Sequence, residues 1–168
     1  GALMLGFIGG FILAMVNTFS KTVRPGLIIA YAAFEGLALG TLSNYIETMY
    51  PGIVSQAVIG TLAAFAGELF MYRSGRLRAT PKFTRVLIGA AIGYIVLGLA
   101  SFISSFFGVG GGYGFYGTGI GLLLAVGGVV IASLFLVLDF DQIENAIRAG
   151  VPETESWRAG FGLMVTLV

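Results

Sequence analysis

The chain has 168 residues, of which 57% are hydrophobic and 10% are charged, and its mean hydropathy is +0.97. Soluble domains carry about 25% charged residues, so this composition excludes an ordinary water-soluble domain and makes a lipid bilayer the expected solvent. The absence of Cys and His excludes thiol nucleophiles, disulfides, His-dependent catalytic triads and the usual zinc sites.

Five apolar stretches are each long enough to cross a bilayer as a helix, which takes about 20 mostly apolar residues. They are residues 1–17, 26–46, 52–72, 86–107 and 116–138, and a sixth apolar stretch begins near Trp157 and continues to Val168. Continuous runs without strand-like alternation exclude a membrane β-barrel. We therefore expect an all-α, polytopic helical membrane bundle, a single domain over residues 1–168 that is truncated at both ends.

The basic residues are segregated among the connections. All nine lie after the first, third or fifth apolar run, in residues 18–25, 73–85 and 142–158, and the other connections hold none. Basic connections face the cytoplasm in most membrane proteins. The pattern therefore predicts a multi-pass protein of the cell membrane with these three connections in the cytoplasm. If the full protein begins in the cytoplasm, an odd number of further spans, most simply one, is expected upstream.

The first two runs combine closely spaced small residues with one acid. Gly6 and Gly10, like Gly36 and Gly40, are four apart, a spacing that lets helix backbones approach closely. Glu35 lies near the middle of its run, in "AYAAFEGLALG". An ionised side chain at the bilayer centre costs about 2.5–3.5 kcal/mol, so Glu35 should face the bundle interior, either in a functional site or in a structural hydrogen bond.

Several polar residues near the run ends have simpler interpretations. Glu47 lies at an outer helix end, and Glu153 and Glu155 lie in a polar loop, so we expect all three to be solvated. Glu68 is about one turn from Arg73 and is expected to extend toward that charge. The run ends also carry aromatic residues typical of membrane interfaces: Tyr45, Tyr50, Tyr72 and Trp157.

The connection "GVGGGYGFYGTGIG" contains a Gly-x-Gly-x-x-Gly string from Gly112 to Gly117. A dinucleotide site needs a strand before such a string and a helix after it within a βαβ unit, which this sequence does not offer. Its "GYG" also lacks the flanking residues and pore helix of a potassium filter. We expect a flexible extracellular loop here.

The segment "FLVLDFDQIENAI" places acids at the end of the fifth run. Asp139 and Asp141 are two residues apart, so on a helix their side chains point about 200° apart. We expect Asp139, the deeper one, to face the bundle and Asp141 to face the interface. A desolvated carboxylate beside another acid can change protonation near neutral pH and offers oxygen ligands to Ca²⁺, although a solvated helix end fits equally well. Glu144 most simply pairs with Arg148 one turn later.

Three segments of the chain closely resemble bacterial Bax inhibitor-1-like proteins, particularly an actinobacterial branch. They are "YAAFEGLALGTLSNYIE", "YPGIVSQAVIGTLAAFAGELFMYRSGRLRATPKFTRVLIGAAIGY" and "LFLVLDFDQIENAIRAGVPETESWRAGFGLMVTLV", of which "TPKFTRV" and "LDFDQIE" are the more specific parts. The resemblance implies a seven-helix fold with six helices around a central seventh. The first helix and the end of the last would then lie outside this sequence.

The same resemblance implies a pH-sensitive calcium leak in which an acid at the end of the sixth helix pairs with an acid on the seventh. The sixth-helix acid falls on Asp139, with Asp141 as a second carboxylate beside it. The basic partner of the gate falls on Arg24 or Lys21. The seventh-helix acid has no counterpart before Val168.

Two functions remain open. The first is a passive, pH-controlled cation leak of the bacterial inner membrane, with Asp139 as main sensor and transient Ca²⁺ or H⁺ ligand, Asp141 as second acid and Glu35 as internal support. The second is a non-conducting stress-response protein that binds and modulates a membrane protease or another membrane partner through "RSGRLRATPKFTR" and "AGVPETESWRAG". Catalysis is not expected, because both aspartates share one helix, and no resident cofactor or nucleic-acid partner is expected.

Overall fold

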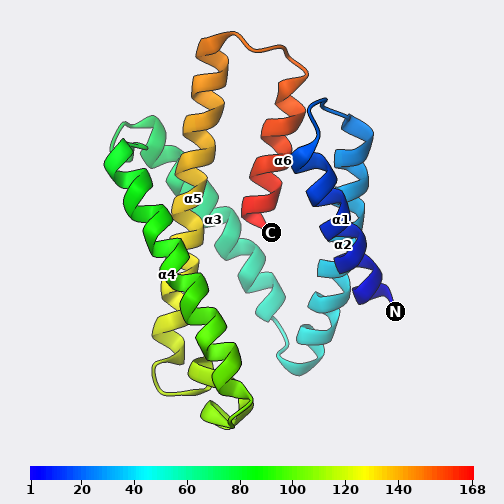
Figure 1. Ribbon diagram of the computed structural model, residues 1–168, viewed down its shortest axis with the longest axis vertical. Coiled ribbons are helices and arrows are strands. Elements are labelled where there is room, and N and C mark those ends of the chain that lie inside the picture. The colour runs from blue at the N-terminus through cyan, green and yellow to red at the C-terminus, as the bar shows by residue number, and fades with distance from the viewer. The chain divides into compact units, whose positions relative to one another are not determined.

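The computed structural model describes all 168 residues and consists of helices joined by short turns (Figure 1). The long helices are α1 (Ala2–Phe19), α2 (Pro25–Met49), α3 (Ile53–Arg73), α4 (Pro81–Ser105) and α5 (Gly121–Ala149), and the shorter α6 (Glu155–Leu167) follows them. Each of the first five is long and apolar enough to cross a membrane. The predicted all-α, multi-span fold is confirmed.

Proline and local caps set the helix starts. Pro25 and Pro81 open α2 and α4 at the first helical position, where a missing backbone N–H costs nothing. The Thr80 hydroxyl caps α4 by accepting the Phe83 N–H at 3.1 Å. These caps place sharp turns where the sequence changes from apolar to polar.

Glu47 caps the start of α3. Its Oε1 accepts the Gly52 N–H at 2.5 Å and its Oε2 accepts the Val54 N–H at 3.1 Å. A carboxylate at this position satisfies free N–H groups and complements the positive end of the helix. The expectation that Glu47 is merely solvated is therefore wrong, because the α2–α3 turn folds back onto it.

Helix α5 is longer than the apolar run that predicted it. It contains 29 residues and continues through Asp139, Asp141 and Glu144 to Ala149, where Gly150 takes a φ of +66°. No Gly or Pro occurs between Gly128 and Gly150, so nothing in the backbone interrupts the helix where the hydropathy falls. The acids thus lie within a continuous helix and not at its end.

The chain folds as two compact units, Gly1–Ala64 with Asn145–Val168, and Phe65–Glu144. In the first unit, α1 and α2 pack side by side (Figure 1). Gly6 and Gly10 are buried, and a Cβ built on Gly6 would lie only 2.7 Å from the Ala38 nitrogen. The predicted close approach at this pair is confirmed, whereas Gly36 and Gly40 have no such neighbour.

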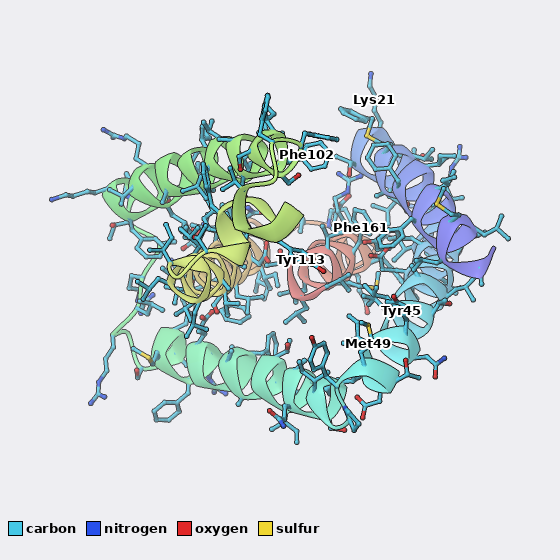
Figure 2. All side chains as sticks on the ribbon, turned by 90° about the horizontal axis from the view of Figure 1, so that it is seen from below. Lys21, Tyr45, Met49, Phe102, Tyr113 and Phe161 are labelled. Carbon is cyan, nitrogen blue, oxygen red and sulfur yellow. The ribbon has the colours of Figure 1, made fainter.

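Helix α6 packs against the α1–α2 pair in the same unit. Phe161, which points toward these helices in Figure 2, meets Tyr31 edge-on with ring centroids 5.1 Å apart, and Ile28 completes the buried cluster. At the start of α6, Arg158 donates to the Ser20 and Lys21 carbonyls at 3.3 and 3.4 Å. The guanidinium thereby satisfies carbonyls left free where α1 ends.

The second unit holds the end of α3, all of α4 and most of α5. Phe140 of α5 packs against the rings of Phe65 and Tyr72 at centroid distances of 5.5 and 5.8 Å. The Tyr94 hydroxyl of α4 donates to the Leu124 carbonyl of α5 at 3.0 Å. Aromatic packing and one hydrogen bond therefore connect α5 to its two neighbours.

The glycine-rich connection is folded into two 3₁₀ turns, η1 (Val109–Gly112) and η2 (Gly114–Gly117). Gly114 is buried with a φ of +62°, directly against Ser101 of α4, whose hydroxyl accepts the Phe115 N–H at 2.9 Å. The glycines allow a tight path that packs onto α4, a contact that the expectation of a flexible loop did not include.

Large apolar side chains cover the outside of the helices. Phe102 and Tyr113, both labelled in Figure 2, are 63% and 78% exposed, and Tyr45 is 63% exposed. Such a surface is typical of helices that face lipid, where apolar side chains need no burial in protein.

Candidate functional site: carboxylates around Tyr72

Tyr72 is the buried centre of a polar cluster in the second unit. The residue is 7% exposed, and its hydroxyl donates to Glu144 Oε2 at 2.5 Å and lies 3.5 Å from Asp141 Oδ1. Tyr45 and Tyr50, which share the predicted interfacial position, are 63% and 62% exposed. Tyr72 differs from them, because its hydroxyl is directed at two acids of α5.

The helix geometry of α5 brings its two acids to one side of Tyr72. Asp141 and Glu144 are three residues apart and therefore share a helix face. Phe140, packed on Tyr72, holds this stretch of α5 against the end of α3. The Asp141 carboxylate is therefore turned toward α3, whereas the sequence predicts that it faces the membrane interface. Glu144 has a partner on the neighbouring helix, Tyr72, which sequence spacing did not reveal.

Arg78, in the turn between α3 and α4, adds one positive charge to this cluster. Its Nη1 lies 3.9 Å from Glu144 Oε2, and its guanidinium carbon lies 5.7 Å from the centre of the Tyr72 ring. The Arg78 side chain is 53% exposed, so this pair contributes less than about 1 kcal/mol to stability. Its effect is local, since the guanidinium faces the Glu144 carboxylate and the Tyr72 ring.

Asp139 and Glu68 place further acidic oxygens inside the second unit. Asp139 Oδ2 and Glu68 Oε2 are both buried from solvent. The inward position expected for Asp139 agrees with this burial. Glu68 lies beside Ser133 of α5 and forms no ion pair with Arg73, which corrects the expected orientation of its side chain.

The four acids do not form a preformed metal centre. No group of three or more carboxylates is close enough to hold a metal ion. A bound divalent cation with an all-protein cage needs six to eight oxygen ligands. Ca²⁺ at Asp139 stays a prediction.

The remaining predicted site residues belong to the first unit. Glu35 is half-buried between α1 and α2, where a Cβ on Gly10 would lie 2.7 Å from its Oε2. Lys21 and Arg24 are exposed in the α1–α2 turn and form no ion pair. Glu35 thus occupies the interior position expected of it, and a gate contact from Lys21 or Arg24 to Asp139 stays a prediction.

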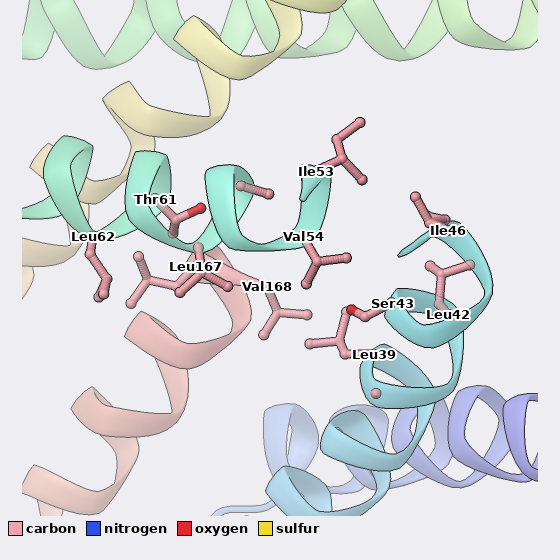
Figure 3. Close-up of a pocket in the computed structure, with 13 residues that line it drawn as sticks. Leu39, Leu42, Ser43, Ile46, Ile53, Val54, Thr61, Leu62, Leu167 and Val168 are labelled. Carbon is pink, nitrogen blue, oxygen red and sulfur yellow. The ribbon is translucent and has the colours of Figure 1, made fainter. Parts of the chain in front are cut away.

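An apolar cavity of about 620 Å³ lies in the first unit between α2, the first half of α3 and the end of α6 (Figure 3). Leucine, isoleucine and valine side chains dominate its walls, and Ser43 and Thr61 supply its only side-chain hydroxyls. None of the side chains that line the cavity carries a charge.

Residues 2–168 match the family model described as Bax inhibitor 1 like. No curated protein and no solved structure matches the chain.

Proposed function

Because the chain belongs to the Bax inhibitor 1 like family over residues 2–168, we propose that this multi-pass membrane protein is a pH-sensitive passive leak for cations, with Ca²⁺ as the main substrate. In this proposal Asp139 is the principal sensor, Asp141 is a second acid and Glu35 supports the bundle from within. The basic connections 18–25, 73–85 and 142–158 face the cytoplasm of a bacterial inner membrane.

One observation carries the proposal: acidic oxygens lie buried within helices that have the length and hydropathy of membrane spans. Asp139 Oδ2 and Glu68 Oε2 are buried, and Asp141 and Glu144 surround the buried Tyr72 hydroxyl. Ionisable side chains are expensive in a bilayer and mark ion or proton pathways when they occur there. Four such acids on two adjoining helices favour cation passage over a purely structural role.

The carboxylates can attract a cation, and their protonation can remove this attraction. Ionised carboxylates lower the energy of a cation entering a low-dielectric region, and protonation removes that attraction. Tyr72 links Asp141 to Glu144 and can redistribute its hydrogen bond when either acid changes charge. Arg78 competes with an entering cation for Glu144, from which it is 3.9 Å away.

The test is calcium flux into liposomes containing the full-length protein, measured across pH 5 to 8 for wild type and Asp139→Asn. The substitution removes the charge and keeps the size, so the pH dependence of flux should flatten. Glu153→Gln is the matched control, because Glu153 is exposed in the α5–α6 connection. Equal pH dependence in wild type and Asp139→Asn would remove Asp139 from the mechanism.

Absence of wild-type flux at every pH would reject the leak itself. Co-purification of a membrane protease under those conditions, unaffected by Asp139→Asn, would instead favour a non-conducting protein that acts through its charged connections.

A further inference from the structure

The turn between α3 and α4 is the most strongly basic segment of the chain. Residues 73–85, called the basic turn below, contain Arg73, Arg76, Arg78, Lys82 and Arg85, and all five are exposed. No acid occurs anywhere from residue 69 to residue 138. The turn therefore carries a charge of +5 that its own sequence does not neutralise.

Only Arg78 among these five has an acidic partner, Glu144 at 3.9 Å. Arg73, Arg76, Lys82 and Arg85 make no ion pair and no side-chain hydrogen bond. Repulsion among like charges on a short turn is unfavourable unless a counter-charge approaches from outside the chain. Arg78 anchors the turn to α5, and the other four side chains remain available for an external anion.

The basic turn also lies where two spans end. Arg73 is the last residue of α3 and Pro81 the first of α4, so both helices meet the membrane surface at this turn. The partial positive charge at the start of α4 adds to the same field. Phe70 and Val86, one turn deeper on the two helices, are 70% and 65% exposed and present apolar surface next to the charges.

We propose that the basic turn binds the phosphate groups of anionic phospholipids, with the acyl chains of the same lipids against the apolar surface at Phe70 and Val86. Clusters of four to eight basic residues next to a membrane span attract anionic lipid at about 1 kcal/mol per residue, which corresponds to about fivefold each. A lipid supplies both the charge and the apolar tail that this surface needs. A protein partner would have to bind at headgroup depth beside lipid-facing side chains. The proposal applies to whichever leaflet the turn faces and does not depend on ion conduction.

Residues 1–168 contain no cysteine, so a single introduced cysteine can be labelled in the full-length protein once any cysteine outside these residues is replaced by serine. Ser74→Cys, in the exposed part of the turn, is labelled with a fluorophore and reconstituted in phosphatidylcholine vesicles. A nitroxide quencher near the glycerol backbone is supplied either on phosphatidylglycerol or on phosphatidylcholine at equal mole fraction. The ratio of the two quenching efficiencies measures the preference for anionic lipid.

We expect a preference of about fivefold or more in the labelled protein with its native basic residues, falling to about one in R73Q/R76Q/K82Q/R85Q. The charge-retaining variant R73K/R76K/R85K should keep the preference. Raising the salt from 0.1 to 1 M shortens the screening length from about 10 to about 3 Å and should reduce the preference without any substitution in the turn. This salt series keeps the test valid if the quadruple variant does not fold.

A ratio near one with the native basic residues, or the same elevated ratio in the quadruple variant, would overturn the proposal. A ratio near one together with a co-purified membrane protein that the quadruple variant loses would also overturn it, and would assign the basic turn to a protein partner.

Discussion

Gly6 of α1 offers a sharp test of how the α1–α2 pair is held together. A Cβ built there would lie 2.7 Å from the Ala38 nitrogen and 2.8 Å from its Cα and Cβ. Carbon atoms pack best at about 3.5–4.0 Å, so Gly6→Ala would push the two helices apart by roughly 0.8 Å. Because the obstruction is mainly backbone, no side-chain rotation can relieve it.

The change in stability expected for Gly6→Ala is the sum of two opposing effects. Overpacking costs typically 1–3 kcal/mol, while replacing glycine by alanine within a helix gains about 0.8–1.0 kcal/mol. Gly6→Ala should therefore destabilise the protein by about 1 kcal/mol. The matched variant Gly36→Ala meets no atom within 4 Å and should gain up to about 1 kcal/mol. The expected difference of about 2 kcal/mol is about 30-fold in the unfolding equilibrium constant.

Equilibrium unfolding in mixed detergent micelles, followed by far-ultraviolet circular dichroism during titration with a denaturing detergent, measures both variants on one scale. If the Gly6→Ala variant were as stable as the Gly36→Ala variant, that result would refute the reasoning, because α1 and α2 would then not touch at Gly6.

Further predictions concern the cluster, the α4–α5 contact and the α3 cap, and the same titration measures all three. Tyr72→Phe should cost about 1–2 kcal/mol through loss of the 2.5 Å hydrogen bond to Glu144. The stability changes of Tyr72→Phe and Glu144→Gln should be non-additive in the double variant, and strictly additive changes would contradict the hydrogen bond. Gly128→Ala should cost about 1 kcal/mol, because the new methyl group would displace the Tyr94 hydroxyl at an overpacking cost of about 1–3 kcal/mol, offset by the helix-propensity gain of about 0.8–1.0 kcal/mol. A gain in stability equal to that of Gly36→Ala would show that Tyr94 packs elsewhere. Glu47→Ala should reduce stability by about 1–2 kcal/mol, because it removes the cap of α3, and Glu47→Gln should have a stability between those of Glu47→Ala and wild type. Wild-type stability in Glu47→Ala would exclude the cap.

The number and approximate position of the spans could be predicted from sequence because lipid leaves a long apolar segment little choice but a helix. The end of helix α5 could not be predicted in this way, because hydropathy reports the solvent around a side chain and not the conformation of the backbone. Asp139 lowers the hydropathy, but only a residue such as Gly150 or Pro152 stops a helix. The run to residue 138 therefore predicted the membrane segment and missed the rest of α5.

The acids of the candidate site could be found by sequence, and their partners could not. Tyr45 and Tyr72 occupy equivalent positions at the ends of apolar runs, yet one is 63% and the other 7% exposed. The difference arises from packing against Phe140, which lies 68 positions away from Tyr72 in the chain (140 minus 72). The three-residue spacing of Asp141 and Glu144 was the one local signal that a shared partner exists, and it becomes informative once α5 is known to continue.

The length of α5 makes bilayer thickness a physical variable for this protein. At 1.5 Å per residue its 29 residues span about 44 Å, whereas the hydrocarbon layer is about 30 Å thick. Short-chain lipids would leave the turn that carries Asp139 and Asp141 hydrated, and long-chain lipids would draw it into hydrocarbon or force α5 to tilt. Acyl-chain length thus sets how much water reaches the acids, so cells that remodel their lipids with growth temperature would alter the carboxylates' surroundings without changing a single residue.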